Sequence, residues 1–342
     1  MQYNRAMAYI LIDKANFYHN LSQLALKAGG KKRLAVVLKD NAYGHGLELM
    51  AELAAEYGIR QAVVISRREA ERILAFFDHV LILGGRPEPI EKCSFAVSEL
   101  RVLEEIDPET LIELKVDTGM HRNGIDPRDL ATALEIVRRR GLRLHGVMTH
   151  YRSADELTSE YFWQKKRFET VKRRVRKAGF TPRFHSHNSA ALLRCKGFDE
   201  EIARVGIAIY GYNTLPEGFD PVELRPVLSL WARRTSTRRV EAGARIGYGG
   251  SYTVLRAMTV STYDLGYGDG WPRGDAADSY MTGEGLPILG RVSMDFVTLE
   301  GDRETVCIMA DAQRAAKHYG TICYEMTTAL MPTIYRTVKE QR

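Results

Sequence analysis

Between about residue 34 and residue 210, short apolar runs alternate with segments that have the periodicity of amphipathic helices. Two of these helical segments, 47–58 and 129–141, end in a glycine, as helices often do. Apolar strands that alternate with helices indicate a parallel sheet buried on both faces. Eight such runs in fewer than 200 residues predict an α/β fold, a closed (β/α)8 TIM barrel. The runs are 34–39, 62–66, 80–85, 95–98, 111–119, 144–150, 183–189 and 205–211.

The character of the chain changes after about residue 224. Segments 227–243, 257–271, 286–300 and 305–309 contain β-branched residues in near-alternation, separated by glycine turns. This pattern predicts a mostly antiparallel β domain that follows the barrel. We therefore expect a barrel domain at 13–224 and a β domain at 225–342, which the strand-like segment 1–12 joins.

Composition narrows the class of protein. The chain has 342 residues, of which 45% are hydrophobic, and its net charge of +6 is spread along the sequence. This favours an anionic small molecule as the ligand over nucleic acid. Four scattered cysteines match no zinc motif and indicate reduced thiols, hence a cytoplasmic enzyme without a metal site. No run approaches the ~20 apolar residues of a membrane helix, and the start of the chain does not resemble a signal peptide.

Polar residues gather where the predicted barrel strands end. Active sites of this fold lie at the carboxyl ends of the strands, so we expect these side chains to converge. Taken singly, a lysine at a strand end is usually solvated, and a lone histidine is usually a hydrogen-bonded core residue. Convergence at one end of the barrel favours a functional role. The residues are Lys39, Lys115, Asp117, Arg122, His150, His185, His187, Ser189, Arg204 and Gly206.

The last two strand ends favour a phosphate group. Ser189 begins a predicted helix, whose free N–H groups attract anions, and Gly206 permits a close backbone approach. Barrels commonly bind phosphate in these two loops. A phosphate there and an amine at Lys39 together suggest pyridoxal 5'-phosphate, bound covalently to the lysine.

Eight motifs support a more specific hypothesis. They are AVVLKDNAYGHG, LKVDTGMHRNG, THYRSADE, HSHNSAALLR, RVGIAIYG, IGYGGSYT, LGYGDGWPR and GRVSMD. In this order they resemble the alanine racemase family, from the N-terminus to about residue 300. The resemblance implies a pyridoxal-phosphate enzyme with a barrel and a β domain, acting as a head-to-tail homodimer. It implies that the enzyme interconverts L- and D-alanine and supplies D-alanine for peptidoglycan in the cell wall.

The resemblance also implies residue roles. Lys39 carries the cofactor and is one base, and Tyr248 of the partner subunit is the opposite base. Racemisation needs both, because the proton leaves one face of the α-carbon and returns on the other. His150 and Arg204 match a relay that lowers the proton affinity of this tyrosine, and Arg204 also faces the pyridine nitrogen. Phosphate contacts match Tyr43, Ser189, Gly206 and Ile207; substrate contacts match Arg122, Met294, Asp295 and Tyr267.

Some positions depart from the family pattern or stay open. Lys115 matches a lysine that is carbamylated in some members. His121 stands where glycine is common, and Asp40 adds a carboxylate beside Lys39, which favours a raised amine pKa. A C-terminal phosphate-binding tyrosine has no secure counterpart, and Tyr335 is the nearest candidate.

Three other functions remain open at the level of sequence. One is a racemase of serine or of broader specificity, and another is a pyridoxal-phosphate decarboxylase of the same architecture. The third is a non-catalytic cofactor carrier made of a barrel alone. An arginine at the pyridine nitrogen disfavours the decarboxylase and aminotransferase chemistry, because it does not readily give up a proton. The second domain and Tyr248 disfavour the carrier.

Overall fold

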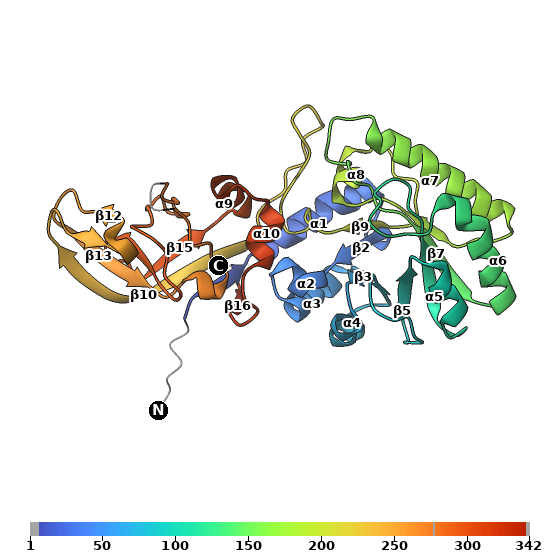
Figure 1. The fold of residues 1–342 in the computed structure, drawn as a ribbon, viewed down its shortest axis with the longest axis horizontal. Helices are drawn as coiled ribbons and strands as arrows, with labels where there is room; N and C mark the ends of the chain where they lie inside the picture. The colour runs from blue at the N-terminus through green and yellow to red at the C-terminus, as the bar shows by residue number, and fades with distance from the viewer. Residues whose placement is uncertain (1–6, 276–277, 340–342) are drawn as a thin grey trace. The chain divides into compact units, whose positions relative to one another are not determined.

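A computed structural model describes residues 7–275 and 278–339 (Figure 1). Residues 1–6 of the expected N-terminal strand lie outside these ranges. The chain divides into two compact units. One unit, the barrel unit, consists of residues 18–42 and 47–225. The other, the β unit, combines the chain up to residue 17 with residues 43–46 and the chain from residue 226 onward.

The barrel unit contains eight parallel strands, which confirms the predicted (β/α)8 barrel. Neighbouring strands pair in chain order, with β9 beside β2 at one end of the series. At the other end, the Arg204 N–H of β9 donates to the His187 carbonyl just after β8, at 2.9 Å. The strands are β2 (Leu34–Val37), β3 (Gln61–Val64), β4 (His79–Ile82), β5 (Cys93–Val97), β6 (Leu111–Lys115), β7 (Arg143–Met148), β8 (Arg183–His185) and β9 (Ala203–Val205).

The eighth strand differs from the prediction, which placed it at 205–211. The strand ends at Val205, and residues 206–211 form consecutive turns. The Ile209 N–H donates to the Gly206 carbonyl at 2.9 Å, and the Tyr210 N–H donates to the Ile207 carbonyl at 3.2 Å. The run is apolar because these turns are buried, and a short buried run has the same composition in a turn as in a strand.

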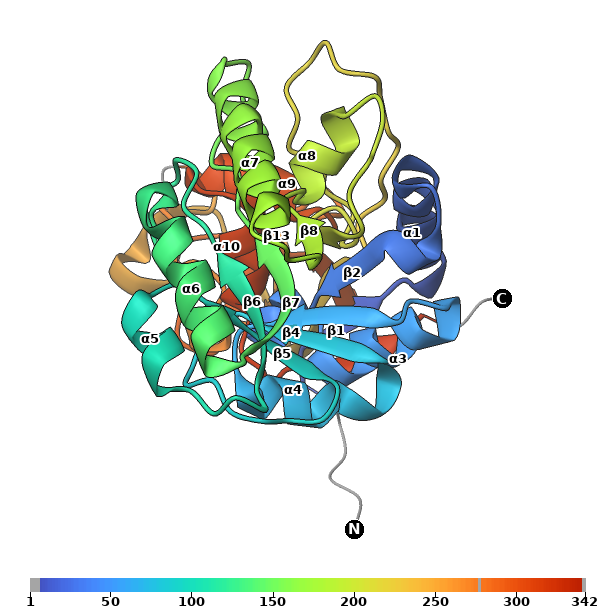
Figure 2. The same cartoon turned by 90° about the vertical axis from the view of Figure 1, so that its right-hand side faces the viewer.

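Helices cover the outer face of the strands (Figure 2). Outward side chains of β6, β7 and β8 pack on α6 and α7, with Ile112 and Val147 touching the cluster that contains Leu134 and Phe168. Burying this stripe of each helix stabilises the barrel, at about 25 cal/mol per Å² of apolar surface. The helices are α1 (Lys14–Ala28), α3 (Leu47–Tyr57), α4 (Arg67–Ile73), α5 (Leu100–Glu105), α6 (Leu130–Arg140), α7 (Glu160–Lys177) and α8 (Ser189–Arg194). The segment labelled α2 (Lys39–Tyr43) is a turn with left-handed backbone at residues 40–43.

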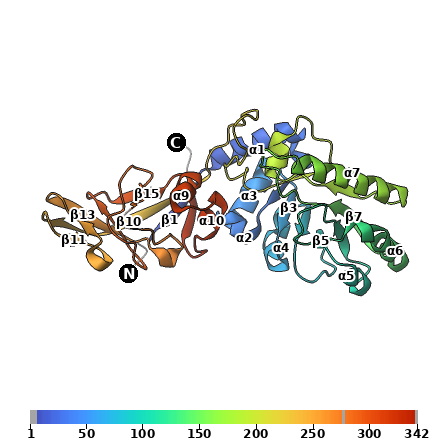
Figure 3. The ribbon, with the colours of Figure 1, turned by 45° about the horizontal axis from the view of Figure 1, so that its top comes forward.

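The β unit is a mostly antiparallel six-stranded sheet with a separate two-stranded ribbon, as the sequence predicts (Figure 3). The N-terminal strand β1 lies between β10, to which it is antiparallel, and β16, to which it is parallel. The strands of the sheet are β1 (Tyr9–Ile12), β10 (Leu228–Val240), β13 (Met258–Tyr263), β14 (Val297–Glu300), β15 (Thr305–Met309) and β16 (Tyr335–Val338). The ribbon pairs β11 (Arg245–Ile246) with β12 (Tyr252–Thr253).

Two short helices, α9 (Ala312–Tyr319) and α10 (Cys323–Thr328), follow β15. The strand-like character of this region did not predict them. In the stretches 7–275 and 278–339, no helix is both long enough and apolar enough to cross a membrane.

Candidate active site

The chain leaves β2 in a strained turn at Lys39. Residues 40–43 have φ angles between 51° and 55°, so they form a left-handed turn without a glycine. Such backbone costs about 1–2 kcal/mol per residue. The Asp40 N–H donates to Glu69 Oε1 at 2.7 Å, which helps to hold the turn. Strain of this kind collects at functional sites, and here it fixes the point from which the lysine side chain projects.

Asp40 contacts the lysine, as its position in the sequence led us to expect. Its Oδ2 accepts a hydrogen bond from Lys39 Nζ at 2.9 Å, and both side chains are partly exposed. This hydrogen bond holds the Lys39 amine beside Asp40 at the end of β2.

His150 lies among the cations that the strand ends bring together. Burial lowers the pKa of its imidazole to about 3, and Arg204, Lys115, Arg122 and Lys39 contribute to the shift. Four cationic side chains from the ends of three strands, β2, β6 and β9, therefore lie near one ring. At neutral pH the ring is uncharged and offers one N–H donor and one acceptor.

Lys115, at the end of β6, is poorly solvated. Burial and the nearby Arg122 and Arg204 lower the pKa of its ammonium to about 8. Its Nζ donates to Asn123 Oδ1. A substantial fraction of this amine is therefore neutral at slightly alkaline pH, which is the form that reacts with carbon dioxide.

The loop after β6 shows why glycine is common at position 121. His121 has a φ of 54°, in the left-handed region that glycine adopts without strain. Its Nδ1 lies 3.0 Å from Asp117 Oδ2. Burial opposes ionisation of Asp117, but backbone N–H groups of Gly119 and His121 lower its pKa. The charged aspartate thus anchors the loop that carries Arg122.

Arg204 projects from β9 into the barrel and is almost fully buried. Its guanidinium donates to the Thr149 carbonyl at 2.7 Å, to the His185 carbonyl at 2.9 Å and to His185 Nδ1. Burial lowers its pKa to about 10, so it remains charged at neutral pH. It is a fixed donor that cannot accept a hydrogen bond.

The loops after β8 and β9 meet at Ser189. Its Oγ accepts hydrogen bonds from the Gly206 N–H at 2.9 Å and the Ala208 N–H at 3.4 Å. Asn188 caps the helix that Ser189 begins, by accepting from the Ala191 N–H. Hydroxyl and backbone donors at a helix start are the groups that recognise phosphate.

This donor set fits pyridoxal phosphate. Lys39 would supply the amine, while Ser189, whose Oγ now accepts from the Gly206 N–H, and the backbone of Ile207 would lie at the phosphate. Arg204 would supply a donor for the ring nitrogen. The pocket's ionisable groups are mainly cationic, and the cofactor is an anion that offers only acceptors at these points.

The β unit carries the second group of candidates, on loops. Tyr248 lies in the 3-10 turn between β11 and β12 and is 66% exposed. It lines a pocket of about 470 Å³ together with Tyr267 and Arg273. An exposed phenol that faces a pocket is available to a ligand or to another protein surface.

Tyr267 is packed against the segment that holds Met294 and Asp295. Its N–H donates to the Ser293 carbonyl at 3.0 Å, and the adjoining Gly268 N–H donates to the Met294 carbonyl at 2.8 Å. A side chain at Gly266 would lie 2.0 Å from the same carbonyl oxygen, so only glycine fits there. The structure therefore brings Tyr248, Tyr267, Met294 and Asp295 into one neighbourhood.

A tyrosine that the sequence reasoning missed lies beside Tyr43. The ring of Tyr324, on α10, is 5.8 Å from the ring of Tyr43, and Gly44 packs against the Thr327 carbonyl of the same helix. Tyr335, the candidate chosen from the sequence, is 63% exposed on β16. Tyr324 is therefore the better candidate for a second phosphate-binding tyrosine. The sequence signal for it is the segment YEM at residues 324–326, eleven positions before Tyr335.

The fold and site thus define a barrel-type pyridoxal-phosphate enzyme with a second, β domain. Family models for the alanine racemase N-terminal and C-terminal domains match residues 12–214 and 227–338. The alanine racemase of a Nitratiruptor species is 43% identical over 97% of this chain and 99% of its own length.

Solved structures agree with this match. Alanine racemase from Bacillus anthracis with bound L-Ala-P has a TM-score of 0.88 and 27% identity, covering 98% of this chain and 95% of that one. Alanine racemase from Bartonella henselae with covalently bound pyridoxal phosphate has a TM-score of 0.81 at 22% identity. It covers 98% of this chain and 100% of its own, and it supports the fold alone.

The chain belongs to the alanine racemase family. It is therefore an amino-acid racemase, an isomerase, of a family that depends on pyridoxal phosphate. This membership favours the racemase over the decarboxylase and over the one-domain carrier that the sequence left open.

Proposed function

We propose that this enzyme interconverts L- and D-alanine with two bases, Lys39 of one subunit and Tyr248 of the partner subunit. The observation that carries the proposal is the arrangement of cations around His150, which include the amine of Lys39, together with the Ser189 hydroxyl at the start of α8. The reaction supplies D-alanine for a bacterial-type peptidoglycan, and we place it in the cytoplasm.

The cofactor and the chain have separate tasks. When bound, pyridoxal phosphate withdraws electrons from the substrate and makes the hydrogen on its α-carbon acidic. Lys39 Nζ and the phenolic oxygen of Tyr248 then move that proton, one on each face of the α-carbon. Because each base acts on one face only, neither can racemise alone.

Arg204 disfavours side reactions such as transamination. Its guanidinium keeps its proton at neutral pH, so a ring nitrogen beside it receives a hydrogen bond without being protonated. This limits electron withdrawal by the ring and disfavours proton transfer to other carbons, as in transamination. Racemisation, which needs only brief loss of the α-proton, remains possible.

Alanine binding is the finer part of the proposal. Arg122 supplies a guanidinium for the substrate carboxylate, and Asp117 and His121 hold its loop. Met294, Asp295 and Tyr267 narrow the other end of the site. Serine differs from alanine by one hydroxyl, and an apolar pocket rejects such a substrate only modestly, so serine is the substrate to test beside alanine.

The dimer follows from the exposure of the second base. Tyr248, Met294 and Tyr267 are large side chains on the surface of the β unit, exposed by 66%, 55% and 43%. Large exposed apolar groups that cluster around a pocket favour a protein contact. A head-to-tail homodimer covers them and completes two sites, each from both subunits.

The test follows L-alanine in heavy water with the purified, cofactor-loaded protein. We expect optical rotation to fall to zero while deuterium enters the α-position, with no release of carbon dioxide. Release of carbon dioxide, or a colourless protein that takes up no pyridoxal phosphate, would contradict the proposal. The same measurement on L-serine defines the substrate range.

A further inference from the structure

A chain of buried hydrogen bonds leads from Arg204 away from the pocket into the barrel. Arg204 Nη1 donates to His185 Nδ1, and on the far side of this ring His185 Nε2 contacts Glu113 Oε2. His185 and Glu113 have no exposed surface, and Arg204 is 5% exposed. The three side chains come from β9, β8 and β6.

The direction of these hydrogen bonds fixes the tautomer of His185. A guanidinium has only donors, so Nδ1 of the ring must be the acceptor and carries no proton. The ring proton is then on Nε2, where it donates to the carboxylate of Glu113. Burial lowers the pKa of His185 to about 4, which keeps the ring neutral and its Nδ1 lone pair free for Arg204.

The second carboxylate oxygen of Glu113 is also held by hydrogen bonds. Its Oε1 accepts from Ser94 Oγ at 2.7 Å and from Arg183 Nη2. Burial opposes ionisation, but His185 and Arg183 hold the pKa of the carboxyl well below its usual value. The interior of such a barrel is normally filled with branched apolar residues, so a charged carboxylate at this position indicates a specific role.

The adjacent strand leaves room for the carboxylate. A Cβ atom at Gly146, on β7, would lie 2.7 Å from Glu113 Oε2, closer than real contacts allow. Glycine at this position therefore permits the Glu113–His185 hydrogen bond. The space is matched to the oxygen that contacts His185, not to the one that contacts Arg183.

A metal site is a weaker interpretation of the same region. His79, Glu113 and His145 each place one possible ligand atom within 4.8 Å of the others. However, Oε1 of Glu113 already accepts from Ser94 and Arg183, and Oε2 contacts His185. A divalent cation would also face the charge of Arg183.

We propose that Glu113 is a positioning residue for racemisation: through His185 it holds the guanidinium of Arg204 at the place where the cofactor's ring nitrogen binds. The carboxylate keeps the ring proton on Nε2, which leaves Nδ1 as a permanent acceptor for Arg204. The role of Arg204 toward the cofactor rests on the proposed function, whereas the effect of Glu113 on His185 does not.

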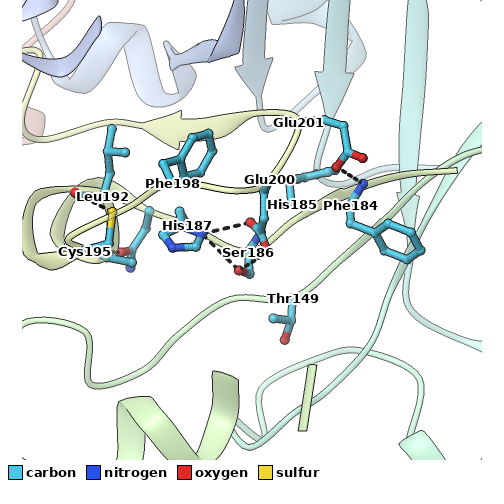
Figure 4. Close-up of polar contacts among 12 residues, drawn as sticks. Thr149, Phe184, His185, Ser186, His187, Leu192, Cys195, Phe198, Glu200 and Glu201 are labelled. Carbon is cyan, nitrogen blue, oxygen red and sulfur yellow. Dashed lines mark hydrogen bonds and ion pairs between the residues drawn. The ribbon is translucent and has the colours of Figure 1, made fainter. Parts of the chain in front are cut away.

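The test compares two buried carboxylates of the same barrel. Glu113→Gln removes the charge behind His185. Glu200→Gln removes a carboxylate that is only 2% exposed and lies 2.9 Å from His187 Nδ1 (Figure 4). The same carboxylate lies 2.8 Å from Lys172 Nζ. Both variants lose a buried ion pair and a histidine contact, but the partner of Glu200 is His187 rather than the ring that contacts Arg204.

The first measurement is the ring tautomer of His185, by nitrogen NMR of full-length protein labelled at its nine histidines, without and with cofactor. His185→Asn identifies the signals. The wild type and Glu200→Gln should show a protonated Nε2 and an unprotonated Nδ1. In Glu113→Gln the side-chain amide can accept from Nε2 or donate to it. When it donates, the ring proton moves to Nδ1 and the hydrogen bond from Arg204 is lost, so we expect a mixture of tautomers instead of one.

The second measurement is the kinetics of the loaded enzyme. The kcat of Glu113→Gln should be lower than that of Glu200→Gln, on the order of tenfold to a hundredfold. Loss of a carboxylate that hydrogen-bonds to a metal-ligating histidine has an effect of this size at metal centres. KM should change little, because substrate contacts remain. Gly146→Ala displaces Glu113 Oε2 while it keeps every charge; it should shift both readouts in the same direction, and it replaces Glu113→Gln if that variant does not fold.

The outcomes separate the two proposals. An unchanged His185 tautomer together with a kcat within about twofold of Glu200→Gln overturns the role of Glu113. A changed tautomer in a protein whose wild type does not racemise alanine leaves the Glu113–His185–Arg204 contact standing and overturns the proposed function instead.

Discussion

The candidate residues of the barrel unit and those of the β unit are held in opposite ways. In the barrel, Arg204 is buried and His150 is half-buried at strand ends. Hydrogen bonds to backbone carbonyls fix the direction of the Arg204 side chain. In the β unit, Tyr248 and Tyr267 are exposed on glycine-containing turns. The barrel candidates are therefore preorganised by their own chain, whereas in the proposed function the exposed candidates of the β unit act in a site of the partner subunit.

The largest effect is expected from substitution of Tyr248, an exposed candidate of the β unit. Tyr248→Phe removes one base and keeps the ring, so exchange of the α-proton should fall on the order of 10²–10⁴-fold for one enantiomer. The other enantiomer should retain exchange through Lys39. Deuterium uptake measured separately from L- and D-alanine gives both rates.

Tyr252→Phe is the matched control, because Tyr252 lies four positions away and packs beside the cluster that contains Val254. It should leave both rates within about twofold of the wild type. Small, equal losses in both directions in Tyr248→Phe would remove this phenol from the mechanism.

A smaller effect is expected at Lys115, in the barrel unit. Because the pKa of Lys115 is lowered to about 8, its neutral fraction, and with it carbamylation, should rise with pH through that value. Labelled carbon dioxide and carbon NMR of the wild type and of Lys115→Gln measure the modification. Occupancy that falls as the pH rises would contradict the assignment.

The lowered pKa of Lys115 also makes the free energy of unfolding depend on pH. Lys115 binds its proton less tightly in the folded chain than the 10.5 expected of a free lysine. The unfolded chain therefore holds more protons between about pH 8 and 10.5, and the free energy of unfolding gains from this group as the pH rises through that window. Below the window, the buried charge is a constant cost.

The smallest effect concerns the strained loop before Arg122. His121→Gly and His121→Ala both lose the imidazole contact to Asp117, but only alanine keeps a Cβ at a φ of 54°. We expect His121→Gly to be more stable than His121→Ala by about 1 kcal/mol. Denaturant unfolding measures the difference, and the reverse order would show that this turn carries no strain.

The sequence predicted the elements that local pattern controls. Strand order and the positions of Lys39, Lys115 and Arg204 follow from apolar runs that alternate with helices. The eighth run was placed wrongly at 205–211, because a buried turn and a buried strand have the same composition. The left-handed turn at 40–43 also escaped prediction, since neither Ala42 nor Tyr43 favours that backbone.

Contacts between segments that are far apart in the chain could not be predicted from the sequence. Glu113 and His185 are 72 positions apart, and only the pairing of β6 and β8 with the two edges of β7 places them together. Tyr324 likewise meets Tyr43 through packing of α10, which a β-type pattern did not reveal. The roles of Tyr248, Tyr267, Met294 and Asp295 stay predictions, because they depend on a second subunit.

The most direct test of a site shared between subunits is complementation. Lys39→Ala and Tyr248→Phe are each purified, mixed in equal amounts under conditions that exchange subunits, and assayed for racemisation. Random pairing makes about half of the dimers mixed, and each mixed dimer has one intact site, so about a quarter of wild-type activity should return. A mixture no more active than the sum of its parts would contradict a site built from Lys39 of one subunit and Tyr248 of the other.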